Sequence, residues 1–362
     1  MKELAIKDIC IKGSSALKQK ELLAIGKYPV YGASGISGYL NSYQQEKPYI
    51  GIVKDGSGIG RVDFYPEKTS LIGTMQYILP KNGYNIRYIG YCLQSLDLSK
   101  YKQGAAIPHI YFRDYGDRLV KVTEDINEQQ HIVSRLDSTF AHIDTLKANA
   151  EKQLREARAL FQKALSKAME PKEGWEEKKL GNVCEIKSIL VDPKEFQYKQ
   201  LLHVGGANIV SETGKLIDLK TAEEEGLTSG KFTFNDNDVL YNKIRPYLIK
   251  VSRPDFLGLC SADMYPLTPK NGMTRDYLYY ILVSHDFTDY AIKNSARAGM
   301  PKLNRQALFA YKCMIPPLSE QQYIVKRLDS LSSNLRKLED IERKVIAECD
   351  ALKQALLRKV FE

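Results

Sequence analysis

The chain repeats one segment almost unchanged. The twelve residues Asn127–Ser138 align with Ser319–Ser330, and nine of the twelve positions are identical. Each copy leads into a long polar segment rich in Ala, Leu, Lys and Glu, which ends at Glu170 in the first copy and at Glu362 in the second. A repeat at a fixed offset is the signature of a duplicated architecture. We therefore expect two copies of one unit, each a globular segment followed by a long helix.

Weaker matches extend the repeat upstream into the globular segments. Leu180–Cys184 resembles Ile6–Cys10, and Gly299–Pro301 resembles Ala106–Pro108. The two copies are related but not identical. Two related but non-identical copies suggest that the chain binds an asymmetric target with pseudo-two-fold geometry.

Both long segments carry a single apolar stripe. The first stripe advances close to the 3.6-residue turn of an α-helix, and the second keeps a heptad spacing interrupted by Glu342. A helix of ~44 residues is ~65 Å long at ~1.5 Å per residue, longer than either domain is wide. Each helix can pack on its own globular segment, but antiparallel pairing of the two helices as a spacer is the simpler account. The expected stripe includes Leu136, Phe140, Leu146, Leu328, Leu331, Leu335 and Leu352.

The chain divides into four predicted segments: globular residues 1–123, a long helix over 124–170, globular residues 171–315 and a long helix over 316–362. The globular segments mix short β-rich runs with Gly, Ser and Pro, which indicates strands joined by turns. The predicted class is α+β, with two globular domains separated by two long antiparallel helices. The strand candidates are 48–53, 60–65, 75–80, 232–234, 239–241, 247–251 and 262–267, and the short-helix candidates are 86–96 and 276–284.

Composition excludes several classes of protein. With 362 residues, 43% hydrophobic and 27% charged, the chain resembles ordinary soluble proteins. No apolar run approaches the roughly 18 residues of a membrane span. The N-terminus lacks an apolar signal-peptide core, so we expect a cytoplasmic protein. Six cysteines without a C-x-x-C pair indicate reduced, buried thiols and neither disulfides nor a zinc site.

The net charge of +9 is unevenly distributed. Residues 1–122 hold 17 Lys and Arg against 10 Asp and Glu, whereas residues 180–315 hold 17 against 15. A basic surface fits a polyanionic partner, since neutralising phosphates supplies most sequence-independent DNA affinity. Charge alone does not distinguish such a protein from a basic protein that binds no nucleic acid.

Catalytic signatures are missing from the sequence. It contains neither a G-x-x-x-x-G-K-[ST] phosphate loop nor a metal-spaced His/Cys set. The Asn/Asp-Pro-Pro-Tyr loop of adenine methyltransferases is also missing, because the single Pro-Pro pair lies in Ile315–Leu318. His109 and His203 are isolated, and a lone histidine is more often packed than catalytic. We predict no catalytic residue, no metal site and no cofactor bound by this chain.

The candidates for DNA contacts are loops that mix glycines, aromatics, amides and cations. The glycine-rich loop 54–61 can approach phosphates through its backbone amides, or it can be an ordinary hairpin. Loop 101–106 has a counterpart at 294–299, and loop 242–247 places two cations and an amide at a turn. Glutamine and arginine have the fork geometry that reads adenine and guanine edges. The predicted DNA-binding residues are Tyr31, Ser34, Lys54, Ser57, Arg61, Lys102, Gln103, Asn242, Lys243, Arg245, Tyr247, Arg297 and Lys302.

The repeated Glu-Gln-Gln opens each long helix. Helix capping explains part of it, with Ser319 as the N-cap and Gln322 as its partner. Capping does not explain why the following residues also match. A surface presented twice suggests two identical partner subunits docking on the two copies. The predicted partner-binding residues are Glu128, Gln129, Gln130, Arg135, Glu320, Gln321, Gln322 and Arg327.

Three motifs together resemble the specificity subunits of type I restriction–modification systems. They are Pro29–Gly35, Asp238–Leu248 and Pro316–Gln322, and the resemblance covers essentially the whole chain. One departure is Thr123–Ile126, where the second copy has its Pro-Pro-Leu entry. The resemblance implies two target-recognition domains on paired helices, two methyltransferase subunits that bind S-adenosylmethionine, and restriction or translocase subunits.

We therefore expect a non-catalytic subunit that binds a bipartite, asymmetric double-stranded DNA site, one half-site per domain. One alternative is a coiled-coil adaptor that binds proteins and reads no DNA; it would lack salt-dependent DNA affinity. The other is an enzyme with an unfamiliar site, which would bind a cofactor as an isolated chain.

Overall fold

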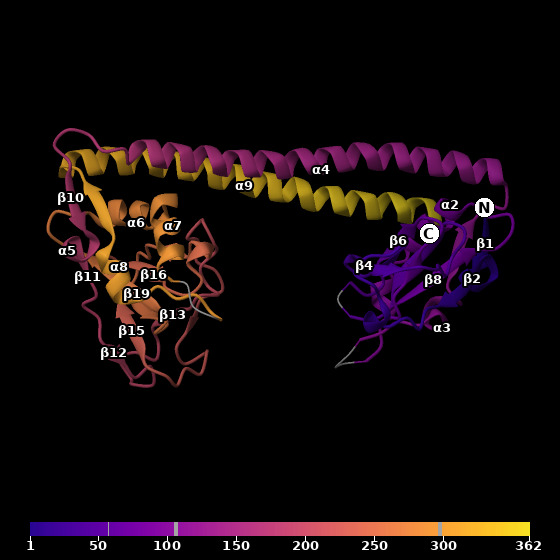
Figure 1. Ribbon diagram of the computed structural model, residues 1–362, viewed down its shortest axis with the longest axis horizontal. Coiled ribbons are helices and arrows are strands. Elements are labelled where there is room, and N and C mark those ends of the chain that lie inside the picture. The colour runs from indigo at the N-terminus through magenta and orange to yellow at the C-terminus, as the bar shows by residue number, and fades with distance from the viewer. Residues whose placement is uncertain (57, 105–107, 296–298) are drawn as a thin grey trace. The chain divides into compact units, whose positions relative to one another are not determined.

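The computed structural model describes residues 1–56, 58–104, 108–295 and 299–362. The chain divides into two compact units: unit 1 comprises Met1–Glu151 with Arg343–Glu362, and unit 2 comprises Lys152–Glu342. Each unit therefore contains a globular part and a section of both long helices (Figure 1). The four segment boundaries predicted from the sequence cut the chain differently, and they stay a prediction.

Both predicted long helices are present. Helix α4 spans Ile126–Ala168 and helix α9 spans Leu318–Phe361. Within unit 1 the α9 residue numbers fall as the α4 numbers rise, so the two helices are antiparallel there. The ion pairs between them are Lys147–Asp350 at 2.7 Å and Asp144–Lys353 at 2.5 Å in unit 1, and Arg158–Glu339 at 2.6 Å in unit 2.

Each helical section also packs on the globular part of its own unit. In unit 1, Leu136 and Phe140 belong to the same buried cluster as helix α2 (Ile86–Ser95). The C-terminal Phe361 is fully buried, with its ring 5.1 Å from that of Tyr88. Pairing and packing on the globular part therefore both occur. The apolar stripe has gaps, because Leu146, Leu331 and Leu352 are exposed and Leu335 is half-buried.

Each globular part contains its own four-stranded antiparallel sheet, and the two sheets have the same strand arrangement. The strand order is β2-β8-β5-β6 in unit 1 and β11-β19-β16-β17 in unit 2. In unit 1 the strands are β2 (Cys10–Ser14), β5 (Tyr49–Val53), β6 (Val62–Tyr65) and β8 (Met75–Pro80). In unit 2 they are β11 (Cys184–Glu185), β16 (Val239–Asn242), β17 (Val251–Ser252) and β19 (Met264–Pro269).

Further elements correspond between the units. A two-stranded sheet joins β1 (Lys2–Ala5) to β9 (Leu119–Val122), and another joins β10 (Glu176–Lys179) to β20 (Lys312–Ile315). Helix α2 follows β8, as helix α6 (Arg275–Val283) follows β19. In unit 2, α6 and α7 (His285–Lys293) lie between α9 and the strands (Figure 1). The predicted α+β class, internal repeat and long antiparallel helices are confirmed.

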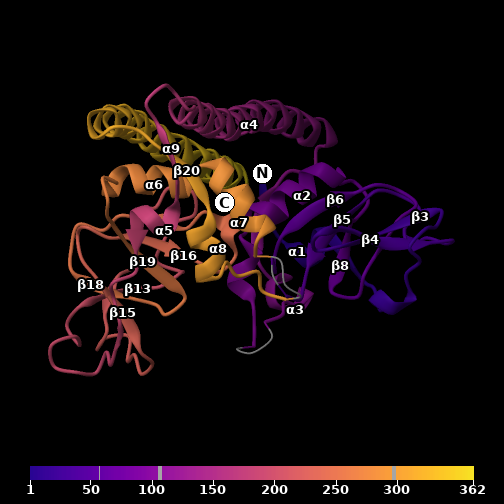
Figure 2. The same ribbon diagram turned by 60° about the vertical axis from the view of Figure 1, so that its left-hand side comes forward.

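The smaller sheets differ between the units. Unit 1 has three strands in the order β4-β3-β7, and unit 2 has five in the order β12-β15-β18-β13-β14. Both contain one parallel pair, β3 with β7 and β13 with β18. Figure 2 shows β15 and β18 on the side of unit 2 away from the long helices. The strands are β3 (Tyr28–Gly32), β4 (Gly35–Leu40), β7 (Ser70–Leu71), β12 (Leu190–Val191), β13 (Leu202–Val204), β14 (Lys220–Thr221), β15 (Lys231–Phe234) and β18 (Gly258–Cys260).

One predicted strand is wrong. Residues 247–251 contain the end of the 3₁₀ helix η3 (Pro246–Leu248), and only Val251 of this run belongs to a strand. Pro246 cannot donate to a sheet, and Arg245 and Ile249 have positive φ values of 51° and 46°. The remaining short elements are α1 (Ile6–Ile9), α3 (Phe112–Tyr115), α5 (Leu180–Val183), α8 (Arg305–Ala310), η1 (Gln19–Glu21) and η2 (Leu98–Tyr101).

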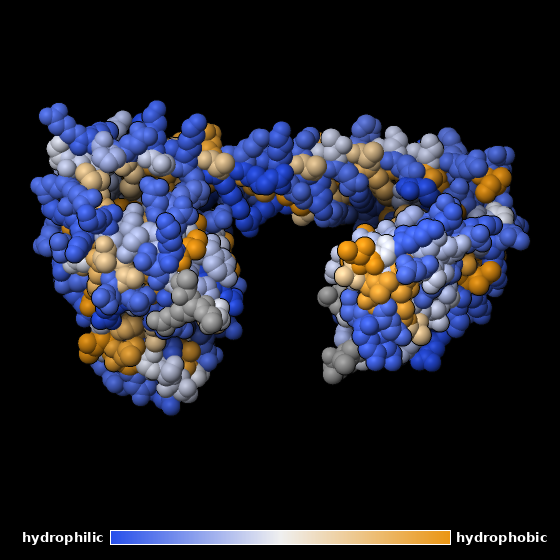
Figure 3. Space-filling view, viewed as in Figure 1, coloured by the Kyte–Doolittle hydropathy of each residue, from blue (hydrophilic) through white to orange (hydrophobic). Residues whose placement is uncertain are grey.

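The surface is mostly hydrophilic, with apolar areas on the globular part of each unit (Figure 3). Exposed apolar side chains accompany both smaller sheets, and they include Ile25, Ile36, Leu190, Phe196 and Leu257. Within the described ranges, none of the helices combines the length and the apolar character that crossing a membrane requires.

Candidate nucleic-acid interface

The same two loops are joined by hydrogen bonds in both units. In unit 1, the loop after β5 meets the segment before α3, where the Ile110 amide donates to the Lys54 carbonyl at 2.9 Å. In unit 2, the loop after β16 meets the segment before α8, where the Leu303 amide donates to the Lys243 carbonyl at 3.0 Å. Fold and duplication thus bring together the loops that the sequence singled out separately.

In unit 2 this junction presents exposed cations and an exposed aromatic. Arg245 and Tyr247 are exposed, and the Arg245 amide donates to the Pro301 carbonyl at 2.9 Å. Ile244 and Lys302 form a β-bridge, and Lys302 Nζ lies 3.8 Å from an Asp263 carboxylate oxygen. The predicted residues Arg245, Tyr247 and Lys302 therefore lie on one junction.

Two predicted DNA contacts are not exposed. Asn242 and Lys243 are each 8% exposed. The Lys243 ammonium donates to the Ala262 carbonyl and lies 4.9 Å from the centre of the Tyr265 ring. Burial lowers the pKa of Lys243, and the nearby Lys302 and Arg305 lower it further. Direct DNA contact by the Asn242 and Lys243 side chains is therefore corrected to a structural role, because both are packed within unit 2.

In unit 1 the glycine-rich loop is tied to a hairpin. The exposed Arg61 pairs with Asp63 at 2.9 Å and donates to the Ala33 carbonyl in the β3–β4 turn, beside the exposed Ser34. Tyr31 is half-buried, with its ring 5.0 Å from that of Tyr65. These contacts are consistent with both alternatives for loop 54–61, an ordinary hairpin and a phosphate-binding loop. The loop is ordered by its contacts and presents the exposed cation Arg61.

The remaining predicted residues of unit 1 lie near this loop. Lys54 is partly buried, with Nζ 4.0 Å from Asp55. Lys102 and Gln103 are exposed, and the Gln103 side-chain Nε2 donates to the Asp114 carboxylate at 2.9 Å. Ser57 in this unit and Arg297 in unit 2 are predicted contacts that lie outside the described residues.

Sequence reasoning missed two exposed groups beside these loops. Arg305 opens α8, and its charge affects both Lys243 and Tyr265. In unit 1, the Arg113 guanidinium lies 4.8 Å from the ring centre of the exposed Tyr111. An aromatic ring and a stacked guanidinium are both surfaces on which bases stack. The close spacing of Arg297, Lys302 and Arg305 in the sequence was an available signal for Arg305.

The middle glutamine of each Glu-Gln-Gln is buried. Gln129 and Gln321 are 0% and 1% exposed. Gln129 donates to the carbonyls of Gly83 and Thr123 and accepts from the Asn85 amide at 2.7 Å. Gln321 donates to Gly272 and Pro316 and accepts from the Thr274 amide at 2.9 Å. The predicted partner contact at these two residues is corrected, since each joins a long helix to its own globular part.

A second repeated contact lies two helical turns further along. In unit 1, Asp137 accepts from Arg87 at 2.6 Å and from the Tyr91 hydroxyl. In unit 2, Asp329 accepts from the Tyr280 hydroxyl at 2.6 Å and from Arg253. We call the glutamine contacts the glutamine clamps and these carboxylate contacts the aspartate latches.

The proposed capping by Ser319 is wrong. Helix α9 begins at Leu318, and the amides of Glu320 and Gln321 donate to the Pro317 carbonyl at 2.9 and 3.0 Å. Glu320 instead binds Lys172 at 2.6 Å and the Trp175 indole at 2.7 Å. Hydrogen bonds from both partners lower the pKa of Glu320.

Other repeated positions stay on the surface. Gln130 and Arg135 are exposed in the first copy, as are Gln322 and Arg327 in the second. Among the described residues, neither arginine has a carboxylate within ion-pair distance. Glu128 accepts from the Thr123 hydroxyl. Internal packing thus accounts for the buried identical residues and leaves the exposed ones without a structural explanation.

Nothing in the described part of the chain groups three or more His, Cys, Asp or Glu side chains as a metal site. All six cysteines are buried, and burial raises the pKa of Cys10 and of Cys184 to about 12. Thiols with such pKa values stay protonated and unreactive near neutral pH. The chemistry that this surface offers is binding through cations, amides and aromatic rings.

Comparison with known families gives one match that spans most of the chain. The family described as "Type I restriction modification DNA specificity domain" matches residues 1–156 and 172–346. The match occurs twice, once on each copy of the repeat, and it confirms the family resemblance drawn from the sequence motifs.

Curated relatives and one solved structure agree. The type I restriction enzyme EcoDI specificity subunit of Escherichia coli is 30% identical over 72% of this chain and 65% of its own length. The StySPI specificity subunit of Salmonella potsdam is 24% identical over 65% of this chain and 55% of its length. The chain thus spans less than two thirds of either relative. A chain from a solved structure, described as the basis of complex assembly and conformational transition of the type I R-M system, matches 99% of this chain and 97% of its own length, with a TM-score of 0.70 and 15% identity, which supports the fold.

Proposed function

This chain belongs to the type I restriction–modification DNA specificity family, and from that premise we propose that it is the sequence-specificity subunit of such a complex. It binds a bipartite, asymmetric double-stranded DNA site, one half-site with each globular part, and leaves catalysis to other subunits. The carrying observation is that both units place the same joined loops on the same four-stranded sheet while their smaller sheets differ. Two readers built on one frame suit a site with two different halves. Such a complex acts where the DNA is, in the cytoplasm.

The exposed cations and amides at the joined loops form the DNA contacts in this proposal. Lys102 and Gln103 act in unit 1 with Arg61, whose guanidinium is held beside the β3–β4 turn. Arg245, Lys302 and Arg305 act in unit 2, with Tyr247 available for stacking. Contacts to phosphates set affinity and register, and contacts to base edges set the sequence.

The repeated exposed residues form the partner surface in this proposal. Gln130 with Arg135, and Gln322 with Arg327, present the same side chains once in each unit. Two copies of one surface fit two copies of one partner, the methyltransferase subunit, which binds S-adenosylmethionine. Restriction or translocase subunits complete the complex.

Methylation mapping of DNA exposed to the assembled complex tests the DNA-reading proposal. We expect methylated adenines in two different half-sites separated by a non-specific spacer. A continuous site, or a palindrome with identical halves, would contradict the two-reader proposal. DNA affinity that does not change with salt, or that is absent, would favour the adaptor alternative, because phosphate contacts release counterions.

Charge reversal tests the partner surface. The double variant R135E/R327E removes both repeated cations, and we expect it to lose co-purification with the methyltransferase subunit while keeping its fold. The matched control is K326E, since Lys326 is exposed beside Arg327 and has Ser134 as its counterpart in the first copy. Wild-type recovery of the complex by R135E/R327E would disprove this surface.

A further inference from the structure

Unit 2 contains a cavity that the proposed DNA and partner contacts do not use. It has a volume of about 310 Å³ and lies where α4 and α9 meet α6 and the loop around Thr213. Its apolar lining consists of Phe161, Ile249, Tyr279, Val283 and Leu335. The volume equals about ten water molecules at roughly 30 Å³ each, at the lower end of the range for small-molecule sites.

The polar rim of this cavity is cationic. Arg155, Arg158 and Arg336 line it, together with the carboxylates Glu212 and Glu339. Both carboxylates bind Arg158, at 3.4 and 2.6 Å. Arg155 and Arg336 have no carboxylate partner among the described residues, and Arg336 contacts two neutral groups, the Thr213 carbonyl at 3.5 Å and the Tyr279 hydroxyl. Two guanidinium groups therefore remain for an anion.

One buried acceptor in the lining lacks a donor. Gln162 Oε1 is buried without a hydrogen-bond partner among the described residues, while its Nε2 donates to the Val283 carbonyl at 3.5 Å. An unpaired buried acceptor costs free energy that a ligand N–H or O–H group recovers. The cavity thus combines an apolar wall, an anion-binding rim and a site for one donor.

We propose that this cavity binds a small aromatic acid, a single ring with a carboxylate at one end and an amino or hydroxyl donor at the other. The carboxylate binds Arg155 and Arg336, the ring packs on Phe161 and Leu335, and the donor binds Gln162 Oε1. Such a ligand contacts both long helices and the globular part of unit 2, so its binding stabilises that unit by mass action. The site is independent of the proposed DNA contacts.

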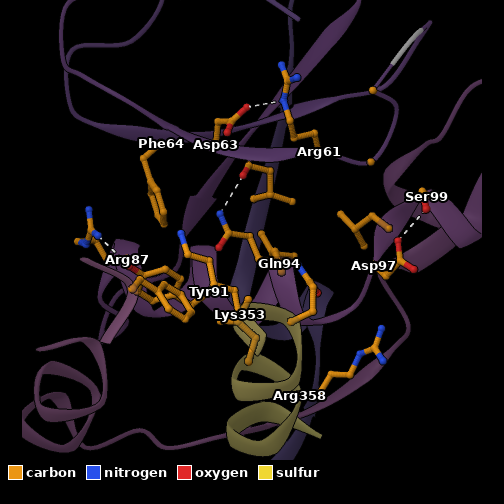
Figure 4. A pocket seen from close by; sticks show the side chains of 18 of the residues that line it. Arg61, Asp63, Phe64, Arg87, Tyr91, Gln94, Asp97, Ser99, Lys353 and Arg358 are labelled. Carbon is orange, nitrogen blue, oxygen red and sulfur yellow. Dashed lines mark hydrogen bonds and ion pairs between the residues drawn. The ribbon is translucent and has the colours of Figure 1, made fainter. Parts of the chain in front are cut away.

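Unit 1 offers a natural control. Its hollow between β6, α2 and the long helices contains Gln354, which follows Gln162 by 192 residues, but it is wider, about 1160 Å³ (Figure 4). Its charges are balanced: the cations Arg61, Arg87, Lys353 and Arg358 face Asp63, Asp137, Asp144 and Asp97. The unit 1 hollow therefore lacks both the narrow apolar walls and the unpaired cations.

Isothermal titration calorimetry of the full chain with 4-aminobenzoate tests the site. We expect one binding site with a dissociation constant on the order of 0.1 mM, which ligands of about ten heavy atoms reach. Benzoate lacks the donor and aniline lacks the anion, so each should bind about tenfold more weakly or worse. Absence of binding at millimolar 4-aminobenzoate would overturn the proposal.

Substitutions assign the contacts. Q162L should weaken 4-aminobenzoate about tenfold and leave benzoate unchanged, whereas R336A should weaken both about tenfold. Two unit 1 variants should leave binding unchanged: Q354L, at the repeat position of Gln162, and R358A, which removes a cation of the unit 1 hollow. Circular dichroism checks that each variant is folded. The Gln162 amide group makes a 3.5 Å contact to one carbonyl, and Arg336 contacts one carbonyl at 3.5 Å and the Tyr279 hydroxyl, so folding should persist. Wild-type affinity for 4-aminobenzoate in Q162L and R336A, or losses of the same size in the unit 1 variants, would place binding elsewhere and refute the site.

Discussion

The two globular parts agree where they hold the long helices and differ where they extend away from the shared sheet. Both use one four-stranded sheet order, one glutamine clamp and one aspartate latch. However, the segments between the first two strands of this sheet in chain order differ. Unit 1 has residues 15–48 between β2 and β5, and unit 2 has residues 186–238 between β11 and β16. We call the four-stranded sheet with its glutamine clamp and aspartate latch the frame. The frame attaches each globular part to the long helices, and the inserted segments give the two globular parts different surfaces.

The insertions also differ in charge. Residues 15–48 contain four Lys and Arg against two Asp and Glu, whereas residues 186–238 contain six against nine. A net negative insertion repels phosphates. In unit 2 the DNA contacts of our proposal therefore concentrate at the joined loops around Arg245 and Arg305, while in unit 1 the hairpin can take part. The comparison predicts that equivalent substitutions in the buried frame have similar effects on stability in the two units. Equivalent substitutions on the exposed surface should have different effects on DNA binding.

The largest expected effect concerns the glutamine clamps. Q129L and Q321L each remove a buried side chain that donates to two carbonyls and accepts from one amide. We expect each to lower the free energy of unfolding by about 3 kcal/mol, since an unsatisfied buried group costs about 1–3 kcal/mol. Chemical denaturation, with hydrogen exchange to locate the loss, measures both.

The neighbouring glutamines supply the matched control. Q130L and Q322L change the same side chain at an exposed position, so they should shift stability by no more than about 0.5 kcal/mol. If only one of the two buried substitutions lowered the free energy of unfolding, the two glutamine clamps would not contribute equally to stability. The common sheet and helix contacts would then differ in energy between the units.

The aspartate latches should differ between the units. D329N disturbs Arg253, whose side chain is 21% exposed and also pairs with Asp276 at 2.7 Å; D137N disturbs Arg87, which is 46% exposed. A more buried charge loses more when its partner is removed. We expect losses of about 2 kcal/mol for D329N and about 1 kcal/mol or less for D137N, measured by urea denaturation. A larger loss for D137N would contradict this reasoning.

Much of the frame was predictable from the sequence, because period and repetition are local signals. The run 48–53 became β5, 75–80 became β8, and the stripes became α4 and α9. The clamp had a signal too. Gln129 stands four residues before Val133 and seven before Leu136, so it continues the apolar stripe and belongs on the buried face.

The candidate site was less predictable, because burial depends on residues far apart in the sequence. Lys243 and Arg245 look equally available in the loop after β16. The Ala262 carbonyl and the Tyr265 ring, contributed by the distant β19 region, cover Lys243 and leave Arg245 exposed. The burial of Phe361 in unit 1 is equally nonlocal, since it requires the last helix to pack on the first globular part.

The DNA proposal predicts different behaviour at equivalent positions. R245A should weaken binding of cognate DNA by about 2 kcal/mol, as expected for a base or phosphate contact. K243M should lower stability without changing base preference, whereas K54A, at the equivalent and more exposed position, should reduce the salt dependence of binding. Fluorescence anisotropy of labelled DNA at several salt concentrations measures the DNA affinity of all three variants, and urea denaturation measures the stability of K243M. Equal DNA effects of K243M and R245A would contradict the buried role of Lys243.

The smallest expected effect is an acid sensitivity confined to unit 2. His203 is buried in β13, binds Glu225 at 2.9 Å and has an unpaired Nε2 among the described residues. Burial lowers the pKa of His203, and the nearby Lys231 lowers it further, against the opposing effect of Glu225. As the pH falls below the ordinary histidine pKa of about 6.5, the unfolded chain binds a proton that the folded chain resists, so stability decreases. We expect a loss of about 1 kcal/mol between about pH 7.5 and about pH 5.5 that H203Q removes. The control H142Q changes an exposed histidine of unit 1 and should keep the full pH dependence; if H203Q kept it as well, the acid sensitivity would arise from carboxylates that both units possess.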